Sequence, residues 1–219
     1  MIGKLLLMNI KEDYHVHCNY NDHSENDLTV ENVIHRAKVI GLKTLAITEH
    51  VRRTSDWVPN YLKEIEILSN DVSVKVIPGF EAKILENGSV DCSEEYSKKY
   101  FLIASFHTVY NSKKIWLKAL KTAIENPNVD VIGHLAPEPG FILENREVAE
   151  LASLLVKNKK IIEINAKYRR PPYDWISHFK KDGVKFHLGS DAHSLDEIGQ
   201  YERISDLISL INGESFTSN

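Results

Sequence analysis

The chain of 219 residues has 42% hydrophobic and 26% charged side chains and a net charge of −4, a balance typical of one globular domain spanning residues 1–219. This acidic charge argues against a broad electrostatic surface for nucleic acid, and no stretch approaches the ~20 apolar residues of a membrane span. Two cysteines and a start without a signal-peptide pattern predict a cytoplasmic protein that has no disulfide framework.

Short β-branched runs and amphipathic stretches alternate along the chain. The first amphipathic stretch repeats Val30, Val33 and Ile34 at helical spacing, with Thr29 placed to cap its start and Gly41 to end it. The polar segment 81–99 is predicted to be a loop. Strands are predicted at 13–16, 44–48, 74–78, 100–104, 129–132, 161–164 and 184–188, and further helices at 61–68, 114–124, 147–157, 175–181 and 202–211.

This alternation predicts parallel strands that are covered by helices. Seven strands favour a closed or nearly closed α/β barrel, and an open doubly wound sheet is the alternative. In a parallel barrel the carboxyl ends of the strands converge on one face. Side chains that follow different strands are therefore expected to meet there.

Histidines and carboxylates follow most of the predicted strands. They are His15, His17 and His23 at the first strand, Glu49 and His50 at the second, Glu81 at the third, His107 at the fourth, His134 at the fifth, and Asp191 and His193 at the seventh. Imidazole and carboxylate are ligands for zinc, iron or manganese. Taken singly, His107 and His134 are better explained as hydrogen-bonded polar residues. Their joint placement at strand ends predicts a metal cluster.

Two local patterns refine this prediction. His15 and His17 are two residues apart, so on a strand both point to the same side, and Asp13 is in phase to orient an imidazole. Other histidines have a different context, within predicted helices or the last strand, and are expected to be structural or surface groups. These are His35, His178 and His187.

The motifs together resemble the PHP family, which is named for polymerase and histidinol phosphatase. They read DYHVH (13–17), a further His23, TEH (48–50), GFE (79–81), SFH (105–107), GH (133–134) and GSDAH (189–193). The resemblance extends from Asp13 to about Tyr201. It implies a distorted seven-stranded (β/α)7 TIM-like barrel with metal-dependent phosphoesterase activity.

By position, the resemblance implies three divalent ions, which would be zinc, manganese or iron. The first would be held by His15, His17, Glu81 and Asp191, the second by Glu81, His107 and His134, and the third by His23, His50 and His193. A metal-activated hydroxide would attack phosphorus, and Asp191 or His193 would move the proton to the leaving group. Glu49 stands where many members have Asp, at a position that is not a ligand.

Within the family, EIN (163–165), Arg169 and the following Pro-Pro-Tyr turn resemble the histidinol-phosphatase branch, where a basic residue meets the substrate phosphate. GHLAPEPGF (133–141) resembles that branch loosely, whereas the stretch after Glu81 is more like the generic phosphoesterases of the family. Further candidates for phosphate binding are Arg170, Lys83, Arg52 and Arg53. The aromatic residues Trp57, Tyr61 and Tyr168 would either wall a substrate pocket or pack in the core.

Hydrolysis of a small phosphomonoester, such as L-histidinol phosphate, is the function that the sequence favours. The alternative is a phosphodiesterase or exonuclease acting on nucleotides or nucleic-acid ends, which the short acidic chain disfavours. A non-catalytic binding module is disfavoured by the complete ligand set. An amidohydrolase-type barrel is disfavoured by the short chain and by the third ligand group.

Overall fold

The computed structural model of the protein describes residues 8–70, 73–137 and 141–213. The opening run at residues 1–7 and residues 138–140 of the segment 133–141 lie outside the described residues. One parallel sheet holds its strands in chain order: β1 (Glu12–Val16), β2 (Thr44–Val51), β3 (Lys75–Lys83), β4 (Phe101–Ser105), β5 (Val131–Ile132), β6 (Ile161–Asn165) and β7 (Lys185–Gly189). The helices are α1 (Val30–Val39), α2 (Val58–Leu68), α3 (Glu94–Ser97), α4 (Lys113–Glu125), α5 (Asn145–Lys157), α6 (Tyr173–Asp182) and α7 (Ser205–Asn212), with 3-10 turns η1 (Leu195–Glu197) and η2 (Glu202–Ile204).

The sheet closes on itself just beyond the end of β7. The backbone N–H of His17 donates to the carbonyl of Ala192 at 3.0 Å, and that of Asp191 donates to the carbonyl of His15 at 2.8 Å. A parallel bridge between Val16 and Ala192 continues this contact. The predicted distorted seven-stranded α/β barrel is therefore confirmed, and the open doubly wound sheet is excluded.

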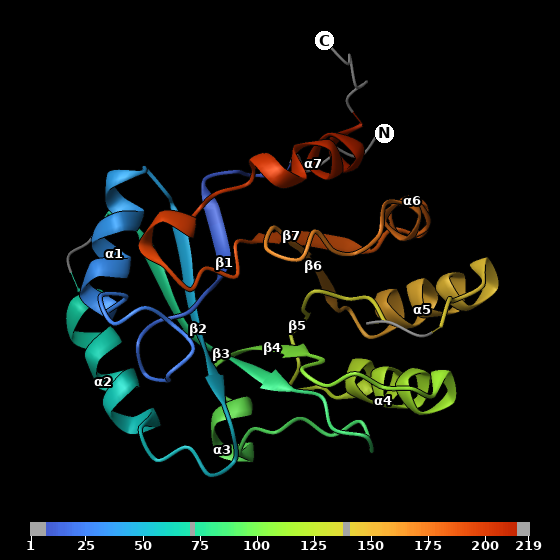
Figure 1. Ribbon diagram of the computed structural model, residues 1–219, viewed down its shortest axis with the longest axis horizontal. Helices are drawn as coiled ribbons and strands as arrows, with labels where there is room; N and C mark the ends of the chain where they lie inside the picture. The colour runs from blue at the N-terminus through green and yellow to red at the C-terminus, as the bar shows by residue number, and fades with distance from the viewer. Residues whose placement is uncertain (1–7, 71–72, 138–140, 214–219) are drawn as a thin grey trace.

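Helices cover the outside of the strands. Figure 1 shows α1 and α2 on one side of the molecule and α4, α5 and α6 on the other. The apolar face predicted for α1 is buried, and the Thr29 side chain caps the helix by accepting from the N–H of Asn32. In α4 the buried face carries Trp116, Ala119, Leu120, Ala123 and Ile124. Burying one large apolar side chain contributes about 1.5–3 kcal/mol, so these faces fix the helices to the barrel.

Several element boundaries differ from the sequence prediction. Strands β2 and β3 are longer than expected because their ladder continues in register through His50 opposite Glu81 and Val51 opposite Ala82. The predicted loop 81–99 thus begins inside β3 and also contains α3. The predicted helix 202–211 is split into η2 and α7, and β5 is only two residues long.

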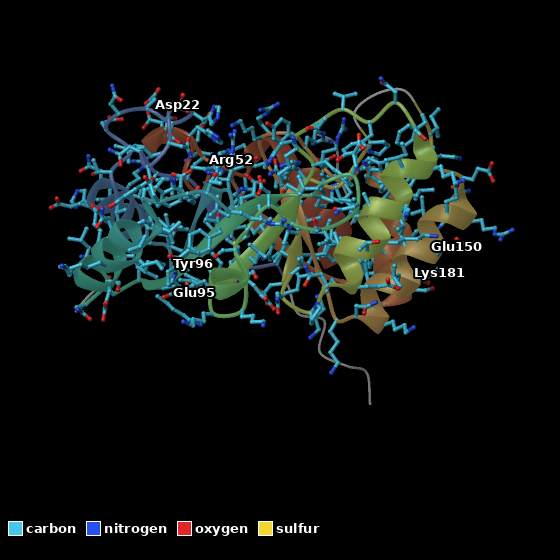
Figure 2. The ribbon with its side chains drawn as sticks, turned by 90° about the horizontal axis from the view of Figure 1, so that it is seen from below. Asp22, Arg52, Glu95, Tyr96, Glu150 and Lys181 are labelled. Carbon is cyan, nitrogen blue, oxygen red and sulfur yellow. The ribbon has the colours of Figure 1, made fainter. Side chains whose placement is uncertain are left out.

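The two ends of the barrel are distinct in Figure 2, where Asp22 and Arg52 lie at one end and Glu95 and Tyr96 at the opposite end. Arg52 directly follows β2, whereas α3 precedes β4, so the first end is that of the strand carboxyl termini. No helix in the described part of the chain combines the length and the apolar character that crossing a bilayer requires.

Candidate metal centre

The carboxyl end of the barrel gathers the predicted ligands into three overlapping groups. Their ligand atoms lie within 4.8 Å of one another in each group, and the groups are His15/His17/Asp191, His50/Glu81/His107 and His17/His50/His193. The members come from different strands or strand ends, as the convergence of a parallel barrel predicts.

Glu81 lies at the centre of the cluster. One carboxylate oxygen is 3.1 Å from His107 Nε2 and 3.0 Å from His134 Nε2, and the other is 2.9 Å from His50 Nδ1. The second oxygen is also 3.5 Å from His15 Nε2. Burial would raise the pKa of Glu81, but His107 and His15 hold that pKa well below its usual range. The carboxylate is therefore ionised and can bridge two cations.

His15, His17 and Asp191 form the most buried group. The Nε2 atoms of the two imidazoles face each other at 3.1 Å, and His17 Nε2 is 3.3 Å from Asp191 Oδ1. Two ring nitrogens and a carboxylate oxygen directed at one small volume are a donor set for a divalent ion. The residues present therefore fit a metal at this position.

The pKa values of the cluster histidines also favour a bound cation. Burial would lower the pKa of His17, but hydrogen bonds to Asp191 and Glu49 outweigh it and raise that pKa to about 9. Burial and the charge of His17 lower the pKa of His193 to about 4. The carboxylates also raise the pKa of His15 and His134, so they draw positive charge onto the buried imidazoles, where a cation would supply the same charge.

The third group is the most open. His50 and His193 group with His17, while His23 has 63% of its side chain exposed and lies 3.8 Å from Asp22. The ring of His23 is 5.7 Å from that of His50, so it borders the group without joining it. Among the expected ligands, His23 has the most exposed side chain.

Glu163 orients two members of the cluster and was not singled out from the sequence as a site residue. Its Oε1 is 2.6 Å from His15 Nδ1, and its Oε2 accepts from the backbone N–H of His134 at 2.6 Å. This contact leaves His15 Nε2 directed at the cluster. A Cβ at Gly189 would lie 2.1 Å from Glu163 Oε1, so only glycine admits the carboxylate there.

Glu49 supports the other imidazole of the pair. It lies 3.4 Å from His17 Nδ1 and accepts from the backbone N–H groups of Cys18 and His50 at 2.9 and 2.7 Å. The prediction that Asp13 orients an imidazole is wrong. The carboxylate of Asp13 is occupied by backbone N–H groups, among them those of Ser190 and Gly199 at 2.9 Å each.

Two of the cluster residues have unusual backbone angles. His134 has a φ of 25° and Asp191 a φ of 57°, in the region that disfavours residues with a Cβ. Conformations of this kind cost of order 1–3 kcal/mol and persist where the surroundings impose them, often at functional sites. Two of the four non-glycine residues with positive φ in the described part of the chain are therefore expected ligands, the others being Lys159 and Arg169.

Two of the predicted phosphate-binding residues, Arg169 and Arg53, contact other parts of the chain. Arg169 turns away from the cluster, because its guanidinium pairs with Asp206 of α7 and donates to the carbonyl of Arg203. The guanidinium of Arg53 donates to Ser89 and to the carbonyl of Val90.

Other candidates keep a position near the barrel mouth. Arg52 is exposed beyond β2, Lys83 ends β3 half-buried, and the backbone of Arg170 pairs with that of Asn165. A basic residue that the sequence analysis did not name, Lys167, places its Nζ 2.8 Å from His193 Nδ1.

The three aromatic residues have separate roles. Tyr61 is a core residue, fully buried, whose hydroxyl donates to the carbonyls of Ile47 and Gly79 at 2.6 and 3.0 Å. Trp57 packs against the Tyr61 ring at 5.5 Å. The ring of Tyr168 is half exposed and lies 5.0 Å from that of His134, so Tyr168 borders the site.

Known proteins resemble this chain in sequence. Residues 13–167 match the PHP domain family model. The chain is 29% identical over 210 residues to a protein of Acetivibrio thermocellus named "Probable phosphatase", covering 90% of this chain and 85% of that one. It is 25% identical to a DNA polymerase/3'-5' exonuclease of Bacillus subtilis, covering 85% of this chain but 35% of that protein.

One solved structure shares the fold over nearly its full length. A Listeria monocytogenes protein described as a candidate histidinol phosphatase superposes with a TM-score of 0.70 at 17% identity, covering 86% of this chain and 97% of that one. At this identity the likeness is one of fold.

Proposed function

Since the chain belongs to the PHP domain family, we propose that it is a metal-dependent phosphatase that hydrolyses a small phosphomonoester. The observation that carries the proposal is the meeting of imidazoles and carboxylates from separate strands within 4.8 Å at the barrel mouth. The match to a probable phosphatase over 85% of that protein's length supports the reaction class.

We assign the cluster to three divalent ions. His15, His17, Glu81 and Asp191 would hold one ion, Glu81 with His107 and His134 a second, and His50 and His193 with His23 a third. The exposed His23 would have to turn toward His50 to complete the third set. Zinc, manganese and iron all suit these ligands.

The catalytic roles follow from the positions of the side chains. Bound divalent ions would polarise the phosphoryl oxygens and lower the pKa of an attacking water. Asp191 is fixed for proton transfer, since Asn165 Nδ2 donates to its Oδ2 at 3.1 Å. His193 is the alternative carrier of this proton, because it is partly exposed and its Nδ1 lies 3.5 Å from Asp191 Oδ1 at the mouth.

The substrate class is proposed from charge and relatives. A net charge of −4 favours a small phosphorylated metabolite over a nucleic acid. L-histidinol phosphate is one candidate, supported by the fold likeness to the Listeria protein. Arg52, Lys83 and Arg170 are proposed to contact the substrate. Two free, buried cysteines, Cys18 and Cys92, suit the cytoplasmic location that we propose.

A phosphodiesterase or exonuclease is the second candidate. The match to the Bacillus subtilis polymerase/exonuclease favours it, although this chain spans only 35% of that protein. The two activities differ in the charge of the phosphoryl group that the site must accept.

The test is a comparison of p-nitrophenyl phosphate with bis-p-nitrophenyl phosphate, using manganese-loaded protein and then a panel of phosphorylated metabolites that includes histidinol phosphate. We expect turnover of the monoester and little of the diester. Preferred turnover of the diester would support the second candidate. No turnover of either ester by protein with bound metal would contradict both and support a binding module.

A further inference from the structure

Lys167 lies at the rim of the metal cluster. It follows the end of β6 by two residues, and its Nζ is 2.8 Å from His193 Nδ1 and 3.9 Å from Asp191 Oδ1. Its side chain is 31% exposed. The ammonium group therefore contacts the cluster on one side and faces the open mouth of the barrel on the other.

The loop that carries Lys167 is held tightly in place. The side-chain carbonyl of Asn165 accepts from the N–H of Tyr168 at 2.8 Å, and the backbones of Asn165 and Arg170 bond to each other at 2.8 and 3.3 Å. The N–H of Ala166 donates to the carbonyl of Gly189 at 2.9 Å. A loop anchored at both ends reduces the entropy cost of holding a long side chain at one point.

The same residue that anchors the loop also holds a proposed ligand. Asn165 uses its side-chain oxygen for the loop and donates from its Nδ2 to Asp191 Oδ2 at 3.1 Å. Lys167 and Asp191 are thus positioned by one buried side chain. Their relative placement is set by the fold rather than by a chance surface contact.

The ammonium group of Lys167 favours a ligand that carries two negative charges. A phosphomonoester is a dianion near neutral pH, whereas a diester is a monoanion with an organic group in place of one free oxygen. Lysine binds phosphate as a compact point charge with three donors. A cation beside the cluster stabilises the doubly charged group more than the singly charged one.

We propose that Lys167 binds a free oxygen of the substrate's phosphoryl dianion beside His193 and thereby makes the site select phosphomonoesters over diesters. This inference rests on the proposed phosphatase function and adds a specificity residue to it. The competing role for Lys167 is to balance the charge of Asp191 alone, without contact to substrate.

The experiment compares wild-type protein with Lys167→Met, Lys167→Arg and a control, Lys185→Met. Lys185 is an exposed lysine at the amino end of β7, so its replacement removes the same charge at the opposite end of the barrel. For each metal-loaded protein, elemental analysis gives the metal content and calorimetry gives the Kd of inorganic phosphate. kcat/KM is measured for the p-nitrophenyl monoester and diester.

We expect Lys167→Met to keep its metal and to bind phosphate about tenfold or more weakly, as the loss of one charge-assisted hydrogen bond implies. Its monoester kcat/KM should fall by a similar factor or more, with the diester value nearly unchanged. Lys167→Arg should recover part of both losses, and Lys185→Met should match wild type.

Unchanged phosphate affinity in Lys167→Met would overturn the proposal. An equal fall in kcat/KM for the monoester and the diester would also overturn it, as would a loss of bound metal from this variant. Absence of phosphate binding by the wild type would also overturn it. If the wild type binds phosphate but hydrolyses neither ester, the proposed function fails, while the phosphate Kd of the variants still decides the role of Lys167.

Discussion

The two ends of the barrel use charged residues in opposite ways. At the amino end, Lys160 donates to the carbonyls of Asn126 and Val129 at 2.7 and 2.5 Å, and Asp130 accepts from the N–H of Leu102 at 2.9 Å. At the carboxyl end, imidazoles and carboxylates converge on one another. The charged groups at the amino end satisfy the backbone, whereas the carboxylates at the carboxyl end also face imidazoles across a shared space.

This difference indicates that charged residues at the amino end serve stability and that those at the carboxyl end serve function. Groups that satisfy backbone atoms stabilise the folded chain, and removing them costs about 1–3 kcal/mol each. The positive φ angles at His134 and Asp191, by contrast, cost backbone energy. Strained backbone whose neighbouring residues are hydrogen-bonded is expected where a protein binds a ligand.

The largest effect should come from the cluster itself. His17→Ala or Asp191→Ala should lower kcat/KM by about 10³-fold or more, because an ion would lose a ligand at the point where charge develops. Circular dichroism should show that the barrel remains folded. The matched amino-end change, Asp130→Ala, should reduce stability while leaving kcat near that of wild type. Full turnover by either cluster variant would refute the site.

The next effect concerns a supporting residue. Glu163→Gln replaces the carboxylate that meets His15 Nδ1, and we expect metal affinity to fall about 10–100-fold. Competition with a chelator measures this affinity directly. Asp130→Asn is the amino-end control and should bind metal as wild type does. Equal metal affinities in the wild type, Glu163→Gln and Asp130→Asn would show that Glu163 does not orient a ligand.

A smaller effect is expected on acid stability. His187 is buried in β7, stacked on Tyr14 at 4.8 Å, and its Nε2 has no hydrogen-bond partner. Burial lowers its pKa from 6.5 to about 4. His187 therefore binds a proton more readily in the unfolded chain than in the folded one. Its contribution to stability is complete above pH 6.5 and is lost as the pH falls toward 4.

His187→Leu should remove that loss. Urea unfolding of both proteins between about pH 7.5 and about pH 4.5 should show the variant losing less stability, by at most about 3 kcal/mol. Both proteins keep the same cluster, so the difference isolates this histidine. Parallel pH profiles would contradict the assignment of a buried neutral imidazole.

The smallest effect should come from Arg169. Its pairing with Asp206 is partly exposed, and such a pair contributes about 0–1 kcal/mol. Arg169→Ala should therefore loosen α7 slightly and leave KM for phosphate esters unchanged. A clear rise in KM would restore the phosphate-binding role expected from the sequence.

The sequence predicted the barrel and the cluster because both depend on short-range patterns. Strand runs are locally readable, and a parallel barrel brings their carboxyl ends together, so His15, Glu81 and Asp191 could be placed near each other in advance. The ends of β2 and β3 were placed too early because they depend on pairing with the neighbouring strand.

Other features depend on partners far apart in sequence. Glu163 lies inside an apolar run, which indicated burial but not that its carboxylate meets His15, 148 residues away. Arg169 was expected to bind phosphate, but Asp206 of α7 holds its guanidinium. Lys167 was missed because its position depends on how Asn165 folds the loop. A charged residue within a buried barrel strand is the signal that would have identified Glu163.

The central claim is that the carboxyl end of the barrel holds divalent ions and the amino end does not. Elemental analysis after saturation with manganese or zinc and removal of free metal tests it most directly. We predict about three equivalents per chain in the wild type and in Asp130→Asn, and fewer in His17→Ala. A wild-type chain that retains no metal, or a His17→Ala chain that retains as much as wild type, would contradict the account.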